Sequence, residues 1–182
     1  MRETDSHVYF WGSFLSNFAW APFVVSFYEE GSDPSTSRKI PVRFHTSEQY
    51  YMFMKAVTFE DGDAMMAILE APDAKSAKAE GRKVKNFDEQ RWYDMSYEVM
   101  VDALRLKFSQ NPDFLQQLFN TGNKTLVEAS PTDKIWGVGL HEDDDAILNE
   151  ENWTGENRLG MALMQVRDEF RKKIIQSNPN IN

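Results

Sequence analysis

The fold is decided by the segment TSEQYYMFMKAVT, residues 46–58. Thr46 is placed to cap the first turn of a helix, and Gln49, three residues on, can reach back to its backbone. We therefore predict a helix over residues 47–58. Apolar side chains occupy nearly all sides of this helix, so most of its surface should be buried. Its polar residues Glu48 and Lys55 should then lie in a partly buried site.

The segments on either side of this helix show further helical and extended patterns. Apolar spacing and terminal residues predict helices over residues 60–70, 72–81, 95–109 (with Asp94 as the cap), 112–121 and 157–175. Extended stretches fall at residues 23–28 and 40–44, joined by a polar loop over 31–37, and at residues 125–127 and 135–138. The pattern predicts an α+β fold, mainly helical, with a small antiparallel sheet.

Length and composition narrow the class of protein. The 182 residues suffice for one domain with one main core, which we place at residues 1–176, followed by a loose tail over 177–182. The absence of cysteine excludes disulfides and thiolate metal sites. No apolar run is long enough for a membrane span, and the N-terminus lacks a secretory pattern, so we expect a cytoplasmic protein without a membrane partner.

Charge and motifs exclude several functions. The formal net charge of −9 disfavours sequence-independent tracking of a nucleic-acid backbone, so any bound phosphate should belong to a discrete ligand. Signatures of serine hydrolases, zinc proteases, P-loop proteins and dinucleotide-binding folds are absent. The acidic segment HEDDDAILNEE, residues 141–151, lacks the spacing of a calcium loop, and we interpret it as solvated. We predict no metal and no cofactor.

Glu48 and Lys55 are the first candidates for chemistry. Seven residues apart on one helix, they share a face two turns apart, roughly 10 Å along the axis. The spacing alone favours surface positions for both, with Glu48 complementing the helix dipole. Their aromatic and apolar neighbours favour a partly buried site.

Two later segments carry further candidates. Asp133 precedes Trp136 and Gly137, where glycine would permit a close approach to a ligand, although an Asx turn beside a core tryptophan is the alternative. Asn157 and Arg158 begin the last helix, where an anion could bind or an ordinary cap could form. The spacing decides nothing for the remaining candidates, Phe14, Asn17, Arg82 and Trp92.

In combination, these segments resemble the NADAR family and its YbiA-like N-glycosidases. The matching blocks are FLSNF (14–18), TSEQYY (46–51) with Lys55, Ala103-Leu104 with Lys107-Phe108, Leu126-Val127-Glu128, Asp133 with WGVG (136–139), and GENRLG (155–160) with Leu163-Met164 and Arg167. They run in order over about residues 8–171. Each block alone is weak, but their order and joint presence are specific.

The resemblance implies hydrolysis of a bond between ribose C1 and nitrogen. It implies two substrate classes, namely riboflavin-pathway intermediates carrying ribose 5-phosphate and ADP-ribose attached to guanine bases, which would include ADP-ribosylated nucleic acid. It also implies that Lys55 forms a Schiff base with C1. We take Glu48 and Asp133 as its catalytic partners. The predicted substrate contacts are Phe14, Asn17, Tyr51, Arg82, Trp92, Trp136, Gly137, Asn157 and Arg158.

The chain departs from the compact YbiA-like pattern in the loop at 31–37 and in the acidic insert at 142–152. Such loops often set specificity on a fixed scaffold, so the choice of substrate is open at these two places. A module that binds ADP-ribose or a nucleotide without turnover is the alternative from another class. It would need the aromatic and phosphate contacts but no desolvated amine beside two carboxylates. A purely structural interaction domain has little support in the sequence.

Overall fold

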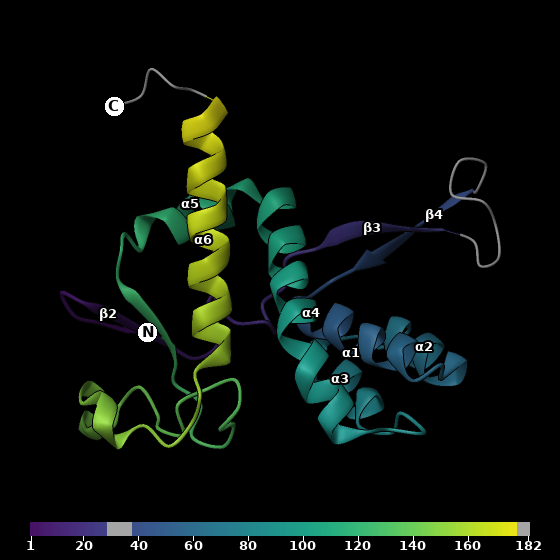
Figure 1. The fold of residues 1–182 in the computed structure, drawn as a ribbon, viewed down its shortest axis with the longest axis horizontal. Helices are drawn as coiled ribbons and strands as arrows, with labels where there is room; N and C mark the ends of the chain where they lie inside the picture. The colour runs from purple at the N-terminus through teal and green to yellow at the C-terminus, as the bar shows by residue number, and fades with distance from the viewer. Residues whose placement is uncertain (29–37, 178–182) are drawn as a thin grey trace.

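The computed structural model describes residues 1–28 and 38–177 and has an α+β architecture (Figure 1). In chain order its elements are β1 (Arg2–Glu3), β2 (His7–Phe10), β3 (Phe23–Tyr28), β4 (Lys39–Phe44), α1 (Ser47–Thr58), α2 (Gly62–Leu69), α3 (Ala74–Gly81), α4 (Glu89–Gln110), α5 (Pro112–Asn120), β5 (Thr125–Glu128), the short 3-10 helices η1 (Asp145–Leu148) and η2 (Glu150–Asn152), and α6 (Arg158–Ser177). The predicted fold class is confirmed. None of the described helices is both long and apolar enough to cross a lipid bilayer.

Helix α1 has the predicted bounds, and its cap explains why. The Thr46 side chain accepts a hydrogen bond from the Gln49 amide at 3.1 Å. The Gln49 side chain reaches back one residue further than expected, since its Oε1 accepts from the backbone N–H of His45 at 2.9 Å. Its Nε2 donates to the carbonyl of Ile68 at 3.0 Å, which ties the start of α1 to the end of α2.

Helix α4 begins earlier than the sequence predicts. Asp88 is the cap, because its Oδ1 accepts from the Arg91 amide at 2.8 Å, and Asp94 lies within the helix. The predicted start at residue 95 is therefore wrong, and Trp92 belongs to the first turns of α4. Asp61 and Asp73 likewise cap α2 and α3, so each of these helices starts two residues later than predicted.

The strands form two sheets. Strands β3 and β4 make the predicted antiparallel hairpin, while the loop predicted over 31–37 and most of the predicted tail, residues 178–182, lie outside the described residues. The second sheet, in the order β1-β2-β5, was not expected, and β2 and β5 pair in parallel. The parallel pair brings Phe10 opposite Glu128.

The strand predicted over residues 135–138 is wrong. Asp133 Oδ1 accepts from the backbone N–H groups of Ile135 at 3.1 Å and Trp136 at 2.8 Å. Because these two N–H groups bond to the Asp133 side chain, they cannot pair with a neighbouring strand, and the segment forms a turn. This is the Asx turn that the sequence left as an alternative.

The main core lies between α1, α4 and α6, and α4 and α6 run side by side (Figure 1). Helix α3 packs closely on α1 at Gly81, where a Cβ atom would lie 2.2 Å from Met52 Sδ and 2.9 Å from Met52 Cβ. Only a residue without a side chain permits this approach. It places the Gly81 carbonyl within reach of Lys55.

A smaller core lies under the acidic insert and consists of Tyr9, Val127, Ala129, Val138 and Ile147. The insert is therefore more ordered than the solvated loop that we expected, since Ile147 is fully buried. Three contacts of 2.8 Å join it to the N-terminal segment. They are the ion pairs of the Met1 ammonium with Glu142 and of Arg2 with Asp145, and the hydrogen bond between His7 and Glu150.

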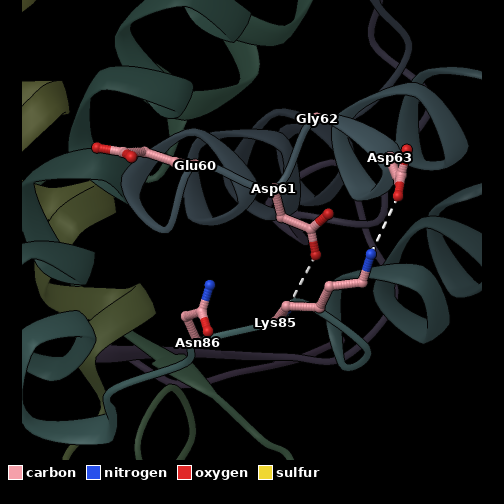
Figure 2. Close-up of a pocket in the computed structure, with 6 residues that line it drawn as sticks. All are labelled: Glu60, Asp61, Gly62, Asp63, Lys85 and Asn86. Atoms are coloured by element: carbon pink, nitrogen blue, oxygen red, sulfur yellow. Dashed lines mark hydrogen bonds and ion pairs between the residues drawn. The ribbon is translucent and has the colours of Figure 1, made fainter.

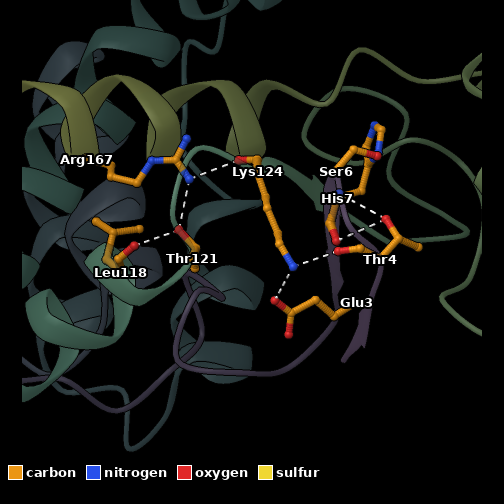
Figure 3. Close-up of polar contacts among 8 residues, drawn as sticks. All are labelled: Glu3, Thr4, Ser6, His7, Leu118, Thr121, Lys124 and Arg167. Atoms are coloured by element: carbon orange, nitrogen blue, oxygen red, sulfur yellow. Dashed lines mark hydrogen bonds and ion pairs between the residues drawn. The ribbon is translucent and has the colours of Figure 1, made fainter.

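Arg167 of α6 fixes the turn before β5 (Figure 3). Its Nη1 donates to Thr121 Oγ1 and to the Lys124 carbonyl, both at 2.9 Å. The Lys124 side chain in turn donates to Glu3 at 2.8 Å and to the Thr4 carbonyl at 2.7 Å. These contacts link α6, β5 and β1, and thereby fix the strand that ends at Glu128.

Candidate active site

Glu48 is buried at the start of α1, with only 1% of its surface exposed. Its backbone N–H donates to the Asn17 carbonyl at 2.9 Å, and the Asn17 side-chain amide donates to Glu48 Oε2. Oε1 has no hydrogen-bond partner, and Lys78 Nζ lies 3.8 Å from it. Burial raises the pKa of Glu48 to about 7, helped by the charge of Asp133 and opposed by Lys78 and Arg82. Glu48 can therefore gain and lose a proton near neutral pH.

Three carboxyl groups share this region. Glu128 at the end of β5 is buried, and its pKa is raised to about 8 by burial and then by Asp133. Asp133 acts on both glutamates, as does Lys78, so the four side chains form one cluster, which we call the carboxylate cluster. Among the residues that the structure describes, no set of three or more carboxylate or imidazole side chains is arranged to hold a metal ion.

The Lys55 side chain contacts the end of α3 and the loop that follows it. Its Nζ donates to the Gly81 carbonyl at 3.0 Å and lies 3.8 Å from the centre of the Phe87 ring. Only 8% of Lys55 is exposed, and burial, followed by the charge of Arg82, lowers the pKa of its amine. Arg82 is exposed at the end of α3. Its positive charge lowers the pKa of both Lys55 and Glu48.

Aromatic side chains line the same face of α1. Tyr51 lies between Glu48 and Lys55 on this face, and its ring centre is 5.0 Å from Trp92 and 5.4 Å from Trp136. The Arg158 guanidinium lies 5.3 Å from the Trp136 ring and 4.5 Å from that of Tyr93. Arg158 is buried, and its Nη1 has no hydrogen-bond partner. A buried cation with a free donor can accept an anionic group.

Asn157 and Gly137, two further predicted substrate contacts, pack against β5 instead. The Asn157 side chain bridges β5, because its Nδ2 donates to the Leu126 carbonyl at 2.9 Å and its Oδ1 accepts from the Glu128 amide at 3.0 Å. At Gly137, a Cβ atom would lie 2.8 Å from Ser130 Cβ and 2.9 Å from the Glu128 carbonyl, so this glycine closes the loop onto β5. Both residues thus position Glu128.

Phe14 belongs to a turn fixed by a buried lysine. Lys107 is fully buried, and its Nζ donates to the carbonyls of Phe14 at 2.7 Å and Ser16 at 2.9 Å. Burial lowers the pKa of Lys107 to about 7. The Phe14 ring packs edge-on against Phe114, 6.1 Å between centres. The turn presents the next residue, Asn17, to Glu48.

The structure thus brings Glu48, Asp133 and Asn17 together, and it places Tyr51, Trp92, Trp136 and Arg158 in an adjoining aromatic group. Sequence reasoning missed Lys78, which shares with Ala74, Ala77 and Gly81 the helix face that packs on α1. It also assigned no role to Lys107 or Glu128. The signal for Lys107 was its position beside Ala103, Leu104 and Phe108, on the buried face of α4.

A separate cavity of about 230 Å³ lies beyond the end of α1 (Figure 2). It is lined by Glu60, Asp61, Gly62, Asp63, Lys85 and Asn86. The Asp61 carboxylate accepts from the backbone of Lys85 at 2.8 Å and of Ala64 at 3.2 Å, so its role there is to cap α2 and join the next loop. None of the carboxylate cluster lines this cavity.

The fold and the cluster define a mainly helical α+β protein with a buried group of ionisable side chains. The chain matches the NADAR domain family over residues 9–171 and belongs to this family. It is 37% identical to an N-glycosidase of Acanthamoeba polyphaga mimivirus over 173 residues, which cover 92% of this chain and 98% of the relative. It is 35% identical to a riboflavin biosynthesis protein of Vibrio vulnificus, covering 70% of this chain and 31% of that protein.

A solved structure has the same fold. The NMR structure of the Escherichia coli protein YbiA matches with a TM-score of 0.69 and 25% sequence identity, covering 96% of this chain and 90% of that one.

Proposed function

We propose that this chain is an N-glycosidase that hydrolyses the bond between ribose C1 and nitrogen in phosphorylated ribosylamines or in ADP-ribosylated guanine. The observation that carries the proposal is the buried Glu48 carboxyl, held by Asn17 beside Asp133 and Lys78. Breaking this bond develops positive charge at C1, which carboxylates stabilise. Relatives named N-glycosidase and riboflavin biosynthesis protein support the same chemistry.

The amine of Lys55 is the proposed nucleophile. Burial favours its neutral form, which has the free electron pair that attack on C1 requires. A bond forms from Nζ to C1 as the bond from C1 to the leaving nitrogen breaks, and the leaving nitrogen gains a proton. The ring C1–O bond then breaks as the imine forms between C1 and Nζ, and the ring oxygen takes the proton that Nζ gives up. Water adds to C1, the C1–Nζ bond breaks, and the sugar and the free amine are released.

The aromatic group and Arg158 are the proposed contacts for the rest of the substrate. Trp136 is half-buried beside Tyr51 and offers a face to the leaving base, and Arg158 has a free donor for phosphate. Trp92 is buried beneath Tyr51 and supports it. A module that only binds ADP-ribose would use the same contacts, but it would have no need of ionisable groups with perturbed pKa values.

The test is to incubate the purified protein with each substrate class and to measure released ribose 5-phosphate and ADP-ribose. Release from either class that Glu48→Gln reduces by about 100-fold or more is the expected result. If neither class releases product and the protein binds ADP-ribose tightly, the chain is a binding module and not an enzyme.

A further inference from the structure

Glu128 has a backbone that is held on both sides. As the last residue of β5, it pairs with Phe10 of β2. Its N–H donates to Asn157 Oδ1 at 3.0 Å, and its carbonyl accepts from the Val138 amide at 3.0 Å. These contacts fix the Glu128 backbone against the start of α6 and the loop that carries Asp133.

The carboxyl group of Glu128 is buried without hydrogen-bond donors for one of its oxygens. The residue is 7% exposed, and Oε2 has no partner. Three charged groups act on it, namely Asp133 on the following loop, Lys78 of α3 and Glu142 of the acidic insert. Two of the three are negative, so the neutral acid is favoured over the carboxylate.

Glu48 has a different environment within the same cluster. It receives a hydrogen bond from the Asn17 amide and has Lys78 at 3.8 Å, and both contacts favour its charged form relative to Glu128. Asp133 uses one oxygen for two backbone N–H groups. Neighbouring carboxyl groups in unequal environments commonly divide the roles of acid and base.

We propose that Glu128 is the general acid of this site and protonates the leaving nitrogen. The inference rests on the proposed function and adds a catalytic residue to it. As the C1–N bond breaks, its electron pair stays on nitrogen and takes the proton of the Glu128 carboxyl. The resulting carboxylate then accepts a proton from the water that hydrolyses the imine, which restores the acid.

The pH dependence of this role has a defined sign. A pKa of about 8 keeps Glu128 protonated at neutral pH. Activity should therefore fall as the pH rises through about 8, because the acid loses its proton. Removing the negative charge of Glu142 should make ionisation of Glu128 easier and move this decline to lower pH.

The experiment compares kcat/KM against pH in the unmodified protein, Glu128→Gln and the control Glu142→Gln. Glu128→Gln should fold and melt at a higher temperature than the unmodified protein at pH 7, because there the unmodified chain ionises this residue only when it unfolds. It should lose about 100-fold or more in kcat and lack the decline near pH 8. Glu142→Gln should keep its kcat near pH 7 and show the decline at lower pH. Full activity in Glu128→Gln, or the same decline in that variant, would overturn the proposal.

A second measurement does not depend on turnover. Carbon-13 labelling of the glutamate carboxyl groups allows each to be titrated by NMR, and the resonance lost in Glu128→Gln identifies Glu128. A midpoint near 8 is expected, and a midpoint below 6 would overturn the role of Glu128 as an acid even in an active enzyme. Absence of hydrolysis in the unmodified protein, together with a midpoint near 8, would instead reject the proposed function.

Discussion

Replacing Glu48 by glutamine should stabilise the protein at high pH while slowing the reaction. The pKa of Glu48 in the folded protein is about 7, against an ordinary value of 4.5. The folded state therefore binds more protons than the unfolded state between these values, and the free energy of unfolding decreases as the pH rises through this range. At about 1.4 kcal/mol per pKa unit, the loss above pH 7 amounts to about 3 kcal/mol.

Glutamine resembles the protonated acid and can still accept the hydrogen bond from Asn17. We therefore expect Glu48→Gln to match the unmodified protein near pH 4.5 and to exceed it by about 3 kcal/mol at pH 8. For a chain of this size the gain is about 6–12 °C in melting temperature. At the same time kcat should fall by about 100-fold or more.

The assay is urea denaturation of both proteins at several pH values, with Glu70→Gln as the control, because Glu70 is exposed at the end of α2. The control should change stability by a few tenths of a kcal/mol at every pH. Equal stabilities of Glu48→Gln and the unmodified protein at both pH 4.5 and pH 8 would refute the burial argument.

Three further predictions follow from the packing and the site. Gly81→Ala should destabilise the protein by about 1–3 kcal/mol in the same assay, because its Cβ would overlap Met52, and unchanged stability would show that α3 can move away from α1. Asp133→Asn should lower kcat by about 100-fold or more while the protein stays folded. Near-normal turnover would mean that Asp133 only stabilises its turn and takes no part in the reaction. Treatment with EDTA should leave turnover unchanged, and loss of turnover that added metal restores would contradict a metal-free site.

Local signals in the sequence were sufficient for α1 and the hairpin. The Thr46 cap and the apolar surface of α1 depend on neighbouring residues of the sequence, and Glu48 and Lys55 are both buried on this helix. The start of α4 was misplaced because Asp88 and Asp94 are the same residue type, which caps helices well, and only the structure shows that the Arg91 amide bonds to Asp88.

The parallel pairing of β2 and β5 could not be predicted, because it joins segments more than a hundred residues apart. The cluster partners of Glu48 were missed for the same reason. Lys78 and Glu128 look like ordinary helix and strand residues until α3 and β5 meet α1. Likewise, the role of Asn157 depends on two backbone groups of β5, which the sequence alone does not place near α6.

Trapping with borohydride tests the central claim most directly. An imine between Lys55 and ribose C1 would be reduced to a stable secondary amine, which leaves a sugar adduct on one tryptic peptide. We predict that the adduct maps to Lys55. Lys55→Arg should lose both adduct and turnover, because arginine stays protonated, whereas the control Lys75→Arg on exposed α3 surface should keep both. Turnover without any adduct, or an adduct on Lys78, would contradict the account.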